Sequence, residues 1–299
     1  MASYPLLRIA TLVGLWAAAA PALAQEACSH VGALGTSRVM EVNPKGGLKV
    51  GLKSYPQTLA LEKGEVVLTF DDGPSPATTG AVLKALDDEC VKATFFLVGR
   101  NAQANPTFVQ REQAAGHTLG HHTFSHPFVT MRGLTEAAAM ADMDAGFAAD
   151  DRAAYGRADG APRTPFFRFP GFADTPELDS WLARRNIAIF GADLWASDWV
   201  EMAPQTTMEL LLTRLDKAGK GIILLHDTRP QTAKMLPDLL RELKTRGYRV
   251  VHIVPARGDE PTALTKAEPG WTSETEAAIA KVWPKILVEK RRMAKPTGG

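Results

Sequence analysis

The chain has 299 residues, enough for one large domain or two small ones. Apolar residues make up 45% of the sequence and charged residues 22%, which are ordinary values for a globular protein with a substantial core. The 34 Lys and Arg side chains nearly balance the 33 Asp and Glu side chains, and the formal net charge is +1. This balance gives no electrostatic reason to expect a nucleic acid or an anionic membrane as a partner.

The first 24 residues have the pattern of a secretory signal peptide. A single charged side chain, Arg8, precedes an apolar run over 9–20, and the segment ends in Pro21-Ala22-Leu23-Ala24. A membrane anchor is the alternative, but the apolar run is shorter than the ~20 residues that a spanning helix needs. We therefore expect cleavage before Gln25, a secreted or periplasmic protein, and no stable membrane insertion after cleavage.

Two cysteines, Cys28 and Cys90, are the only ones in the chain. In an exported protein they could form a disulfide, or they could remain two unpaired thiols, and the sequence does not decide between these. With no second pair and no Cys-x-x-Cys motif, neither a thiolate zinc site nor thiol redox catalysis is supported.

Residues 25–64 contain six glycines and two prolines and are expected to form a mostly irregular lead-in segment. From residue 65 short apolar runs alternate with helical patterns. The expected strands are Val66–Phe70, Ala93–Val98, Thr118–His122, Phe166–Phe169, Ile187–Ala192, Ile222–His226 and Val250–Val254. The expected helices are Ala77–Glu89, a helix from Pro106 to about Gly116, Thr135–Asp150, Glu177–Arg185, Pro204–Ala218 and Ala233–Arg246.

Seven strands alternating with helices predict an α/β fold with a parallel sheet, either open and doubly wound or closed into a barrel. Polar residues with reactive side chains follow nearly every expected strand, and barrel active sites are assembled at that end. A distorted barrel of seven strands, over residues 65–258, is therefore favoured. Residues 259–299 are expected to form a short helical appendage with a frayed end and not a second domain.

Two adjacent carboxylates, Asp71 and Asp72, end the first expected strand and are followed by Gly73-Pro74. A turn at Gly73 could aim both toward one cavity, although Asp-Asp-Gly-Pro is also ordinary turn chemistry. Four of the seven histidines lie between residues 117 and 126. We place His122 and His126 on a loop at a strand end, where two neutral imidazoles and a carboxylate could bind a divalent cation and leave a coordination position open.

Three further segments carry polar groups that a catalytic site could use. Arg168 stands among phenylalanines, where a guanidinium needs a carboxylate partner, and Asp71 or Asp72 is the obvious candidate. The segment 193–199 offers Asp193, Asp198 and two tryptophans, which could pack on a sugar ring or in the core. His226 ends an apolar strand and could be a core residue, a ligand or an acid–base group.

Together these segments resemble the polysaccharide deacetylase family, also called the NodB-homology family or carbohydrate esterase family 4. Its five motifs appear in order: Thr69 to Gly73 (Thr-Phe-Asp-Asp-Gly), His122 to His126 (His-Thr-x-x-His), Arg168 to Pro170 (Arg-x-Pro), Asp198-Trp199 and Leu224 to His226 (Leu-x-His). Each motif alone is weak, but five in order are specific, and they span roughly residues 65–254. The resemblance implies a distorted (β/α)7 barrel.

The resemblance also implies a role for each matching residue. The metal ligands would be Asp72, His122 and His126. Asp71 would be the general base, oriented by Arg168, and His226 would be the general acid, oriented by Asp198. The substrate-binding residues would be Pro170, Gly171, Trp199 and Leu224, with Trp199 and Leu224 around the acetyl methyl group and a backbone N–H near Gly171 as oxyanion donor.

The sequence departs from the family pattern at two positions. An aromatic residue usually follows the proline of the third motif, and here Gly171 stands there, with Phe172 after it. This puts the oxyanion donor and the groove wall in doubt. His121 stands where the family often has Asn, and we expect it behind the metal ligands rather than on the metal.

The implied function is metal-dependent deacetylation of N-acetylglucosamine in an extracytoplasmic polymer: peptidoglycan, a chitin-type oligomer or an exopolysaccharide. Ester-linked acetyl groups would suit the same chemistry. The ligand types favour zinc, with cobalt or nickel as alternatives. Two other functions remain open, an amidohydrolase of the same fold acting on a small amide or imide and a non-catalytic sugar-binding relative. The presence of both Asp71 and His226 and the expected signal peptide favour the polysaccharide deacetylase.

Overall fold

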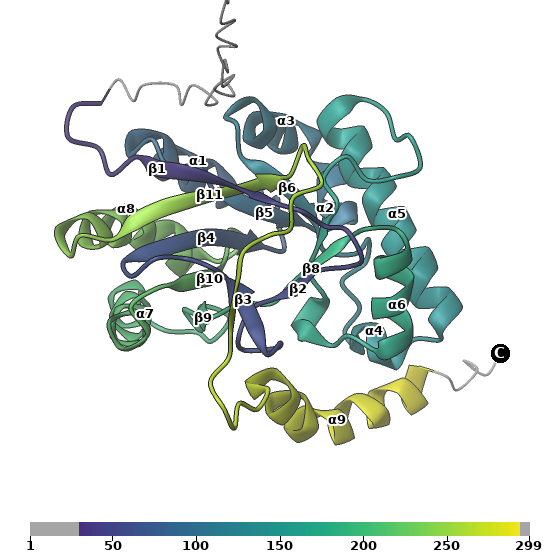
Figure 1. The fold of residues 1–299 in the computed structure, drawn as a ribbon. Helices are drawn as coiled ribbons and strands as arrows, with labels where there is room; N and C mark the ends of the chain where they lie inside the picture. Colours follow the sequence, from purple (N-terminus) through teal and green to yellow (C-terminus); the bar gives the residue numbers. More distant parts are fainter. Residues whose placement is uncertain (1–29, 294–299) are drawn as a thin grey trace, which may run out of the picture.

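A computed structural model of the chain describes residues 30–293, shown in Figure 1. The expected signal peptide over 1–24 lies outside the described residues, and so does Cys28, one half of the possible disulfide. No helix within 30–293 combines the length and the apolar character needed to cross a membrane.

The centre of the fold is one sheet in which all strand pairs are parallel. Its strands are β1 (Thr36–Val42), β2 (Lys49–Val50), β4 (Glu65–Asp71), β5 (Thr94–Leu97), β6 (Thr118–His121), β7 (Phe166–Phe167), β8 (Ala188–Phe190), β9 (Leu194–Trp195), β10 (Gly221–His226) and β11 (Arg249–Pro255). A separate antiparallel pair joins β3 (Gln57–Leu59) and β12 (Leu264–Lys266). All seven expected strands are present, with shorter ends in most cases.

The sheet curls into a distorted barrel. Strands β4, β5, β6, β7 and β8 pair in succession, and on its other side β4 pairs with β10, which pairs with β9. In the resulting order β9, β10, β4, β5, β6, β7, β8, the two end strands β8 and β9 do not pair, but residues 191–193 connect them and so close the barrel through the chain itself. All seven residues of β4 are buried, as expected for a strand at the centre of a covered parallel sheet. The expected α/β fold with a distorted barrel is confirmed.

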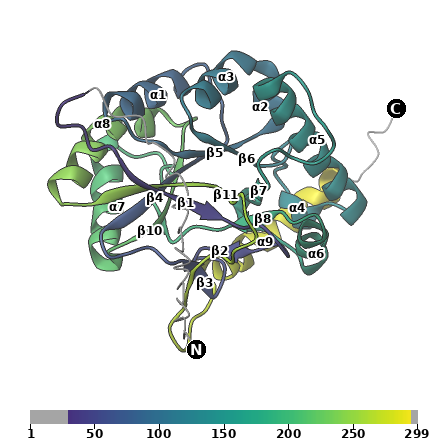
Figure 2. The same ribbon diagram turned by 45° about the horizontal axis from the view of Figure 1, so that its top comes forward.

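Helices surround the strands, as Figure 2 shows. Their bounds are α1 (Thr79–Asp88), α2 (Gly99–Ala104), α3 (Pro106–Ala114), α4 (Thr130–Gly133), α5 (Glu136–Tyr155), α6 (Pro176–Arg184), α7 (Pro204–Ala218), α8 (Pro230–Thr245) and α9 (Glu274–Met293), with a short 3-10 helix η1 (Pro170–Phe172). The six expected helices correspond to α1, α3, α5, α6, α7 and α8. Helices α2 and α4 were not expected, because their six and four residues are too few to show a helical periodicity.

The lead-in segment is more regular than expected. It contains β1, β2 and β3, and both β1 and β2 join the main sheet, through β11 and β8. Between its buried end residues, β1 alternates exposed with half-buried residues, because the strand lies at the edge of the sheet. Arg38 of β1 donates two hydrogen bonds to the buried carboxylate of Glu65, at 2.8 and 2.6 Å, and holds the pKa of Glu65 at about 2. The expectation of mostly irregular structure was therefore wrong for these stretches.

Candidate metal centre and active site

The carboxyl ends of the barrel strands surround a cavity of about 360 Å³. Residues from β4, β10 and the loop after β6 reach it, as the positions of the reactive residues at strand ends led us to expect. The cavity is lined by Asp71, Asp72, His122, His126, Phe169, Gly171, Phe172, Trp195, Trp199, Leu224, His226, Arg229, Thr275 and Ala278.

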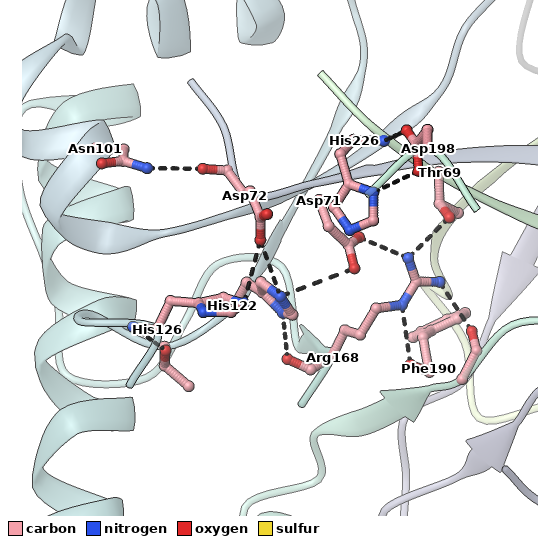
Figure 3. A network of polar contacts seen from close by, with 12 residues as sticks. Thr69, Asp71, Asp72, Asn101, His122, His126, Arg168, Phe190, Asp198 and His226 are labelled. Atoms are coloured by element: carbon pink, nitrogen blue, oxygen red, sulfur yellow. Dashed lines mark hydrogen bonds and ion pairs between the residues drawn. The ribbon is translucent and has the colours of Figure 1, made fainter. Parts of the chain in front are cut away.

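Asp71 and Asp72 both reach this cavity although they are neighbours in the chain. Asp71 is the last residue of β4, and Asp72 follows with a positive φ of 75°. Neighbouring side chains of an extended strand point to opposite faces, and the left-handed conformation, which Asp tolerates better than most residues, breaks that alternation. The backbone carbonyl of Asp72 accepts a hydrogen bond from Asn101 Nδ2 at 2.8 Å, which holds the turn (Figure 3).

Asp72, His122 and His126 form a group that could hold a metal ion. One ligand atom from each residue lies within 4.8 Å of the other two. Asp72 Oδ1 lies 3.5 Å from His122 Nε2 and 3.3 Å from His126 Nε2. His122 follows β6 directly and His126 lies in the next loop, where positive φ angles at Thr123 and His126 exclude a helix. The expected loop and the expected ligand trio are thus brought together in space.

The chemistry of these three side chains fits a divalent cation. Asp72 Oδ1 is buried and has no hydrogen-bond donor among residues 30–293, which is costly for a carboxylate oxygen without a cation. His122 Nδ1 lies 2.7 Å from the carbonyl oxygen of Arg168, so Nδ1 carries the proton and Nε2 presents a lone pair. Burial lowers the pKa of His126 and thereby favours the neutral imidazole that binds metals.

Arg168 lies behind Asp71 and is fully buried. Its Nη1 donates to Asp71 Oδ1 at 2.7 Å and to Thr69 Oγ1 at 2.8 Å (Figure 3). The remaining donors reach the carbonyl oxygens of Phe190 and Gly191, and the guanidinium stacks over the ring of Phe96. Because each face and edge of the guanidinium is in contact, Arg168 holds Asp71 in one orientation. Asp71 Oδ2 then lies 3.9 Å from His122 Nε2, beside the group formed by Asp72, His122 and His126.

His226 lies at the end of β10 and is paired with Asp198. Its Nδ1 lies 2.8 Å from Asp198 Oδ1, and its backbone N–H donates to Asp198 Oδ2 at 2.7 Å. Thr232 Oγ1 also donates to Asp198, so the carboxylate is fixed from three sides. Burial alone would lower the pKa of His226, but the charge of Asp198 and its hydrogen bond outweigh burial and raise this pKa to about 9.

Aromatic side chains form one wall of the cavity beside His226. The ring of Trp199 contacts the rings of His226 and Trp195 edge to face, and Trp195 contacts Phe172. Trp199 is 42% exposed, so its ring is open to a ligand rather than buried in the core. Three of the four expected substrate-binding residues, Gly171, Trp199 and Leu224, line the cavity.

The fourth, Pro170, is buried and does not line the cavity in the described part of the chain. The backbone N–H of Phe172 donates to the carbonyl of Phe169 at 2.9 Å, so this group is not available as an oxyanion donor. The side chain of Phe172 does line the cavity. An aromatic ring thus reaches the cavity wall one residue later than the family pattern would place it.

Two polar residues near the motifs, His121 and Asp193, lie away from the metal group, as expected for His121. His121 points to the other side of β6, where Nδ1 lies 2.7 Å from Asp150 Oδ2 and the ring packs against Phe147. Burial lowers the pKa of His121 to about 3 and raises the pKa of Asp150 well above its usual value. Asp193 accepts hydrogen bonds from the backbone of Leu52 and Ile222 and supports the fold. Of the two aspartates in 193–199, Asp198 is the one at the site.

Arg229, Thr275 and Ala278 also line the cavity and were not expected there. Arg229 follows His226 by three residues and could have been found from that proximity alone. Thr275 and Ala278 lie on α9, at the far end of the chain, and nothing in their local sequence indicates a place in the site. Only the tertiary fold brings this helix to the carboxyl ends of the strands.

Comparisons with known proteins agree with this geometry. A sequence model described as polysaccharide deacetylase matches residues 59–175. A chitin deacetylase from Colletotrichum lindemuthianum is 32% identical over 219 residues, which cover 69% of this chain and 84% of that protein. The chain belongs to the polysaccharide deacetylase family. Its motif order and its curled parallel sheet are both those of a polysaccharide deacetylase.

Other relatives in this family are bacterial. A peptidoglycan-N-acetylglucosamine deacetylase from Bacillus cereus is 31% identical over 193 residues, covering 62% of this chain and 68% of the relative. A peptidoglycan deacetylase from Bdellovibrio bacteriovorus has a similar solved structure, with a TM-score of 0.65 and 29% identity over 74% of this chain and 60% of that chain. The match to the peptidoglycan-N-acetylglucosamine deacetylase of Listeria monocytogenes spans only 39% of that longer protein.

Proposed function

We propose that this polysaccharide deacetylase removes acetyl groups from N-acetylglucosamine residues of an extracytoplasmic polysaccharide in a metal-dependent hydrolysis. One observation carries the proposal. Asp71, held by Arg168 through Oδ1, presents its second oxygen 3.9 Å from His122 Nε2, next to the Asp72, His122 and His126 group. A carboxylate that is held in one orientation and is not itself one of the three ligands is suited to act as a base.

Asp72, His122 and His126 would hold the metal, with zinc favoured by the two imidazoles and cobalt or nickel as alternatives. When bound, such an ion polarises the acetyl carbonyl and makes water more acidic. Three protein ligands leave room for water and substrate, which is typical of catalytic rather than structural sites.

Asp71 would take the proton from the attacking water as the oxygen of that water bonds to the acetyl carbon. Arg168 binds Oδ1 of Asp71 and thereby fixes Oδ2 as the oxygen that faces the substrate. The backbone N–H of Gly171, at the edge of the cavity, would be the donor to the developing oxyanion.

His226 would complete the reaction by donating its Nε2 proton to the nitrogen of the sugar as the C–N bond breaks. The products are acetate and a free amine on the sugar. A pKa of about 9 keeps His226 protonated at neutral pH, and Asp198 fixes the ring so that Nε2 is the atom left for the substrate. Trp199 and Leu224 would surround the acetyl methyl group.

The polymer is proposed from the relatives and from the expected export. The named relatives act on peptidoglycan and chitin, both of which contain N-acetylglucosamine. The segment 1–24 would direct this chain to the outside of the cytoplasm, and such polymers lie there. An exopolysaccharide would present the same group. The proposed reacting residues all lie within 65–258, which we take as the catalytic domain.

Acetate release from a panel of substrates tests this function. The panel should contain N-acetylglucosamine oligomers, peptidoglycan, acetylated xylan and small amides, each with metal and with a chelator. We expect metal-dependent acetate release from the N-acetylated sugars. Release from small amides alone would favour the amidohydrolase, and binding of sugars without any release would favour a non-catalytic relative.

A further inference from the structure

Helix α9 contributes to the cavity although it lies outside the segment 59–175 that the family model matches. Thr275 and Ala278 line the same cavity as Asp71 and His226. The helix contacts α4, which follows the loop of His126, and η1, which carries Gly171. Figure 1 shows α9 outside the ring of helices and beside α4. A late segment of the chain therefore borders the entrance to the proposed reaction site.

The N-terminal end of α9 is fixed to the loop that follows β2. Trp271 Nε1 donates to the carbonyl of Leu52 at 2.7 Å. The backbone N–H of Thr275 donates to the carbonyl of Lys53 at 3.0 Å, and Thr275 Oγ1 donates to Ser54 Oγ at 3.2 Å. These bonds place Thr275 at the cavity wall in a defined orientation.

A second attachment joins α9 to the opposite side of the site. Arg132 of α4 pairs with the carboxylate of Glu276 through both terminal nitrogens. The same guanidinium donates to the backbone and the carboxylate of Asp174, two residues after Phe172. Arg132 thus connects the helix to the segment that forms the wall near Gly171. Two separate attachments hold α9 in one place over the cavity.

If α9 served only to stabilise the fold, every side chain of the helix that faces the domain should be packed against the core. Ile279 and Ile286 are indeed buried, at 8% and 6% exposure. Ala278, by contrast, is exposed and borders the open cavity. A helix that is rigidly attached but leaves a small side chain facing an open site is suited to contact a ligand.

We infer that α9 is a wall of the substrate cleft, held in place through Thr275, and that Ala278 is a specificity-determining position for the sugar units next to the reacting acetamide group. This inference rests on the proposed function. The small, exposed side chain of Ala278 leaves space for a sugar ring, and a larger side chain there would fill part of the cavity of about 360 Å³. Binding of neighbouring sugar units contributes to the rate on a polymer but not on a small acetyl compound.

The test compares Ala278→Trp with Ala280→Trp. Ala280 does not line the cavity and lies about 200° around the helix from Ala278, so it is a matched control for the added indole and for helix stability. Each variant is loaded with zinc, checked by thermal unfolding, and measured on N-acetylglucosamine hexamer and on 4-nitrophenyl acetate, a small ester that needs only the acetyl end of the site.

We expect Ala278→Trp to lower kcat/KM on the hexamer about tenfold or more relative to the small ester, the size of effect that a steric change in a binding pocket gives. Ala280→Trp should leave this ratio as in the wild type. An unchanged ratio in Ala278→Trp would overturn the role of α9 while the proposed function stands. A zinc-loaded wild type that releases no acetate from the hexamer would overturn the proposed function and this inference with it.

Discussion

Arg168 Nη1 lies 2.7 Å from Asp71 Oδ1, and this ion pair is buried beneath the proposed reaction site. The two residues are 97 positions apart in the chain, and β4 and the end of β7 bring them together. A buried arginine is tolerated only with compensating partners, and this one has a carboxylate, a hydroxyl and two carbonyls. The arrangement couples the stability of the barrel to the orientation of the proposed base.

Replacing Arg168 should therefore affect folding as well as activity. Arg168→Met leaves Asp71 buried without its partner, and breaking a buried pair in this way costs about 3–5 kcal/mol. We expect the free energy of unfolding, measured by denaturant titration, to fall by about that amount, together with loss of acetate release. Arg168→Lys keeps the charge but not the four directed hydrogen bonds. Its free energy of unfolding should lie between those of Arg168→Met and the wild type. An Arg168→Met protein as stable as the wild type would contradict the role of this pair.

Metal binding should depend on His126 and not on His121. His126→Ala removes one of the three proposed ligands, and we expect the metal content after dialysis, measured by elemental analysis, to fall to near zero. His121→Asn is the matched control because His121 lies just before His122 but points toward Asp150. It should keep its metal. Equal metal content in His126→Ala and the wild type would contradict the ligand assignment.

The pH dependence should reveal the pairing of His226 with Asp198. Since the pKa of His226 is raised to about 9, its acid form is present below that pH, and kcat/KM should fall as the pH rises through about 9. In Asp198→Asn the largest of the charges that raise this pKa is gone, while burial, which lowers it, and the smaller raising effects of Asp72 and Asp71 remain. The alkaline fall should then move to lower pH. An alkaline limb at the same pH in Asp198→Asn would show that this pair does not set it.

The sequence predicted the barrel and placed the proposed reacting residues at the strand ends because both depend on local patterns. Runs such as Val66–Phe70 are buried on both faces and read as continuous apolar stretches, and the residue after each run falls at the carboxyl end of the sheet. The motifs place Asp71, His122 and His226 at such ends. Their assembly into one cavity follows from the parallel arrangement.

Other features could not be predicted because they depend on contacts that are distant in sequence. Exposed and half-buried residues alternate in β1, and the pairing of β1 with β11 links residues that are more than 200 positions apart in the chain. The place of α9 in the cavity is set by Arg132 and by the loop around Lys53, which no local pattern reveals. The side of β6 to which His121 points depends on how β6 pairs with β5, a contact between different parts of the chain.

The rate of acetate release by Asp71→Asn tests the central claim most directly. Asn has nearly the same shape as Asp but cannot accept the proton of water, and loss of a general base typically lowers the rate about 10²–10⁴-fold. With N-acetylglucosamine hexamer and zinc-loaded protein, we expect a loss of this size in kcat, with metal content close to that of the wild type. Thermal stability should fall because Arg168 loses its charged partner, so the assay is run at a temperature at which circular dichroism shows the variant folded. A zinc-loaded Asp71→Asn protein that releases acetate at the wild-type rate would show that Asp71 is not the base.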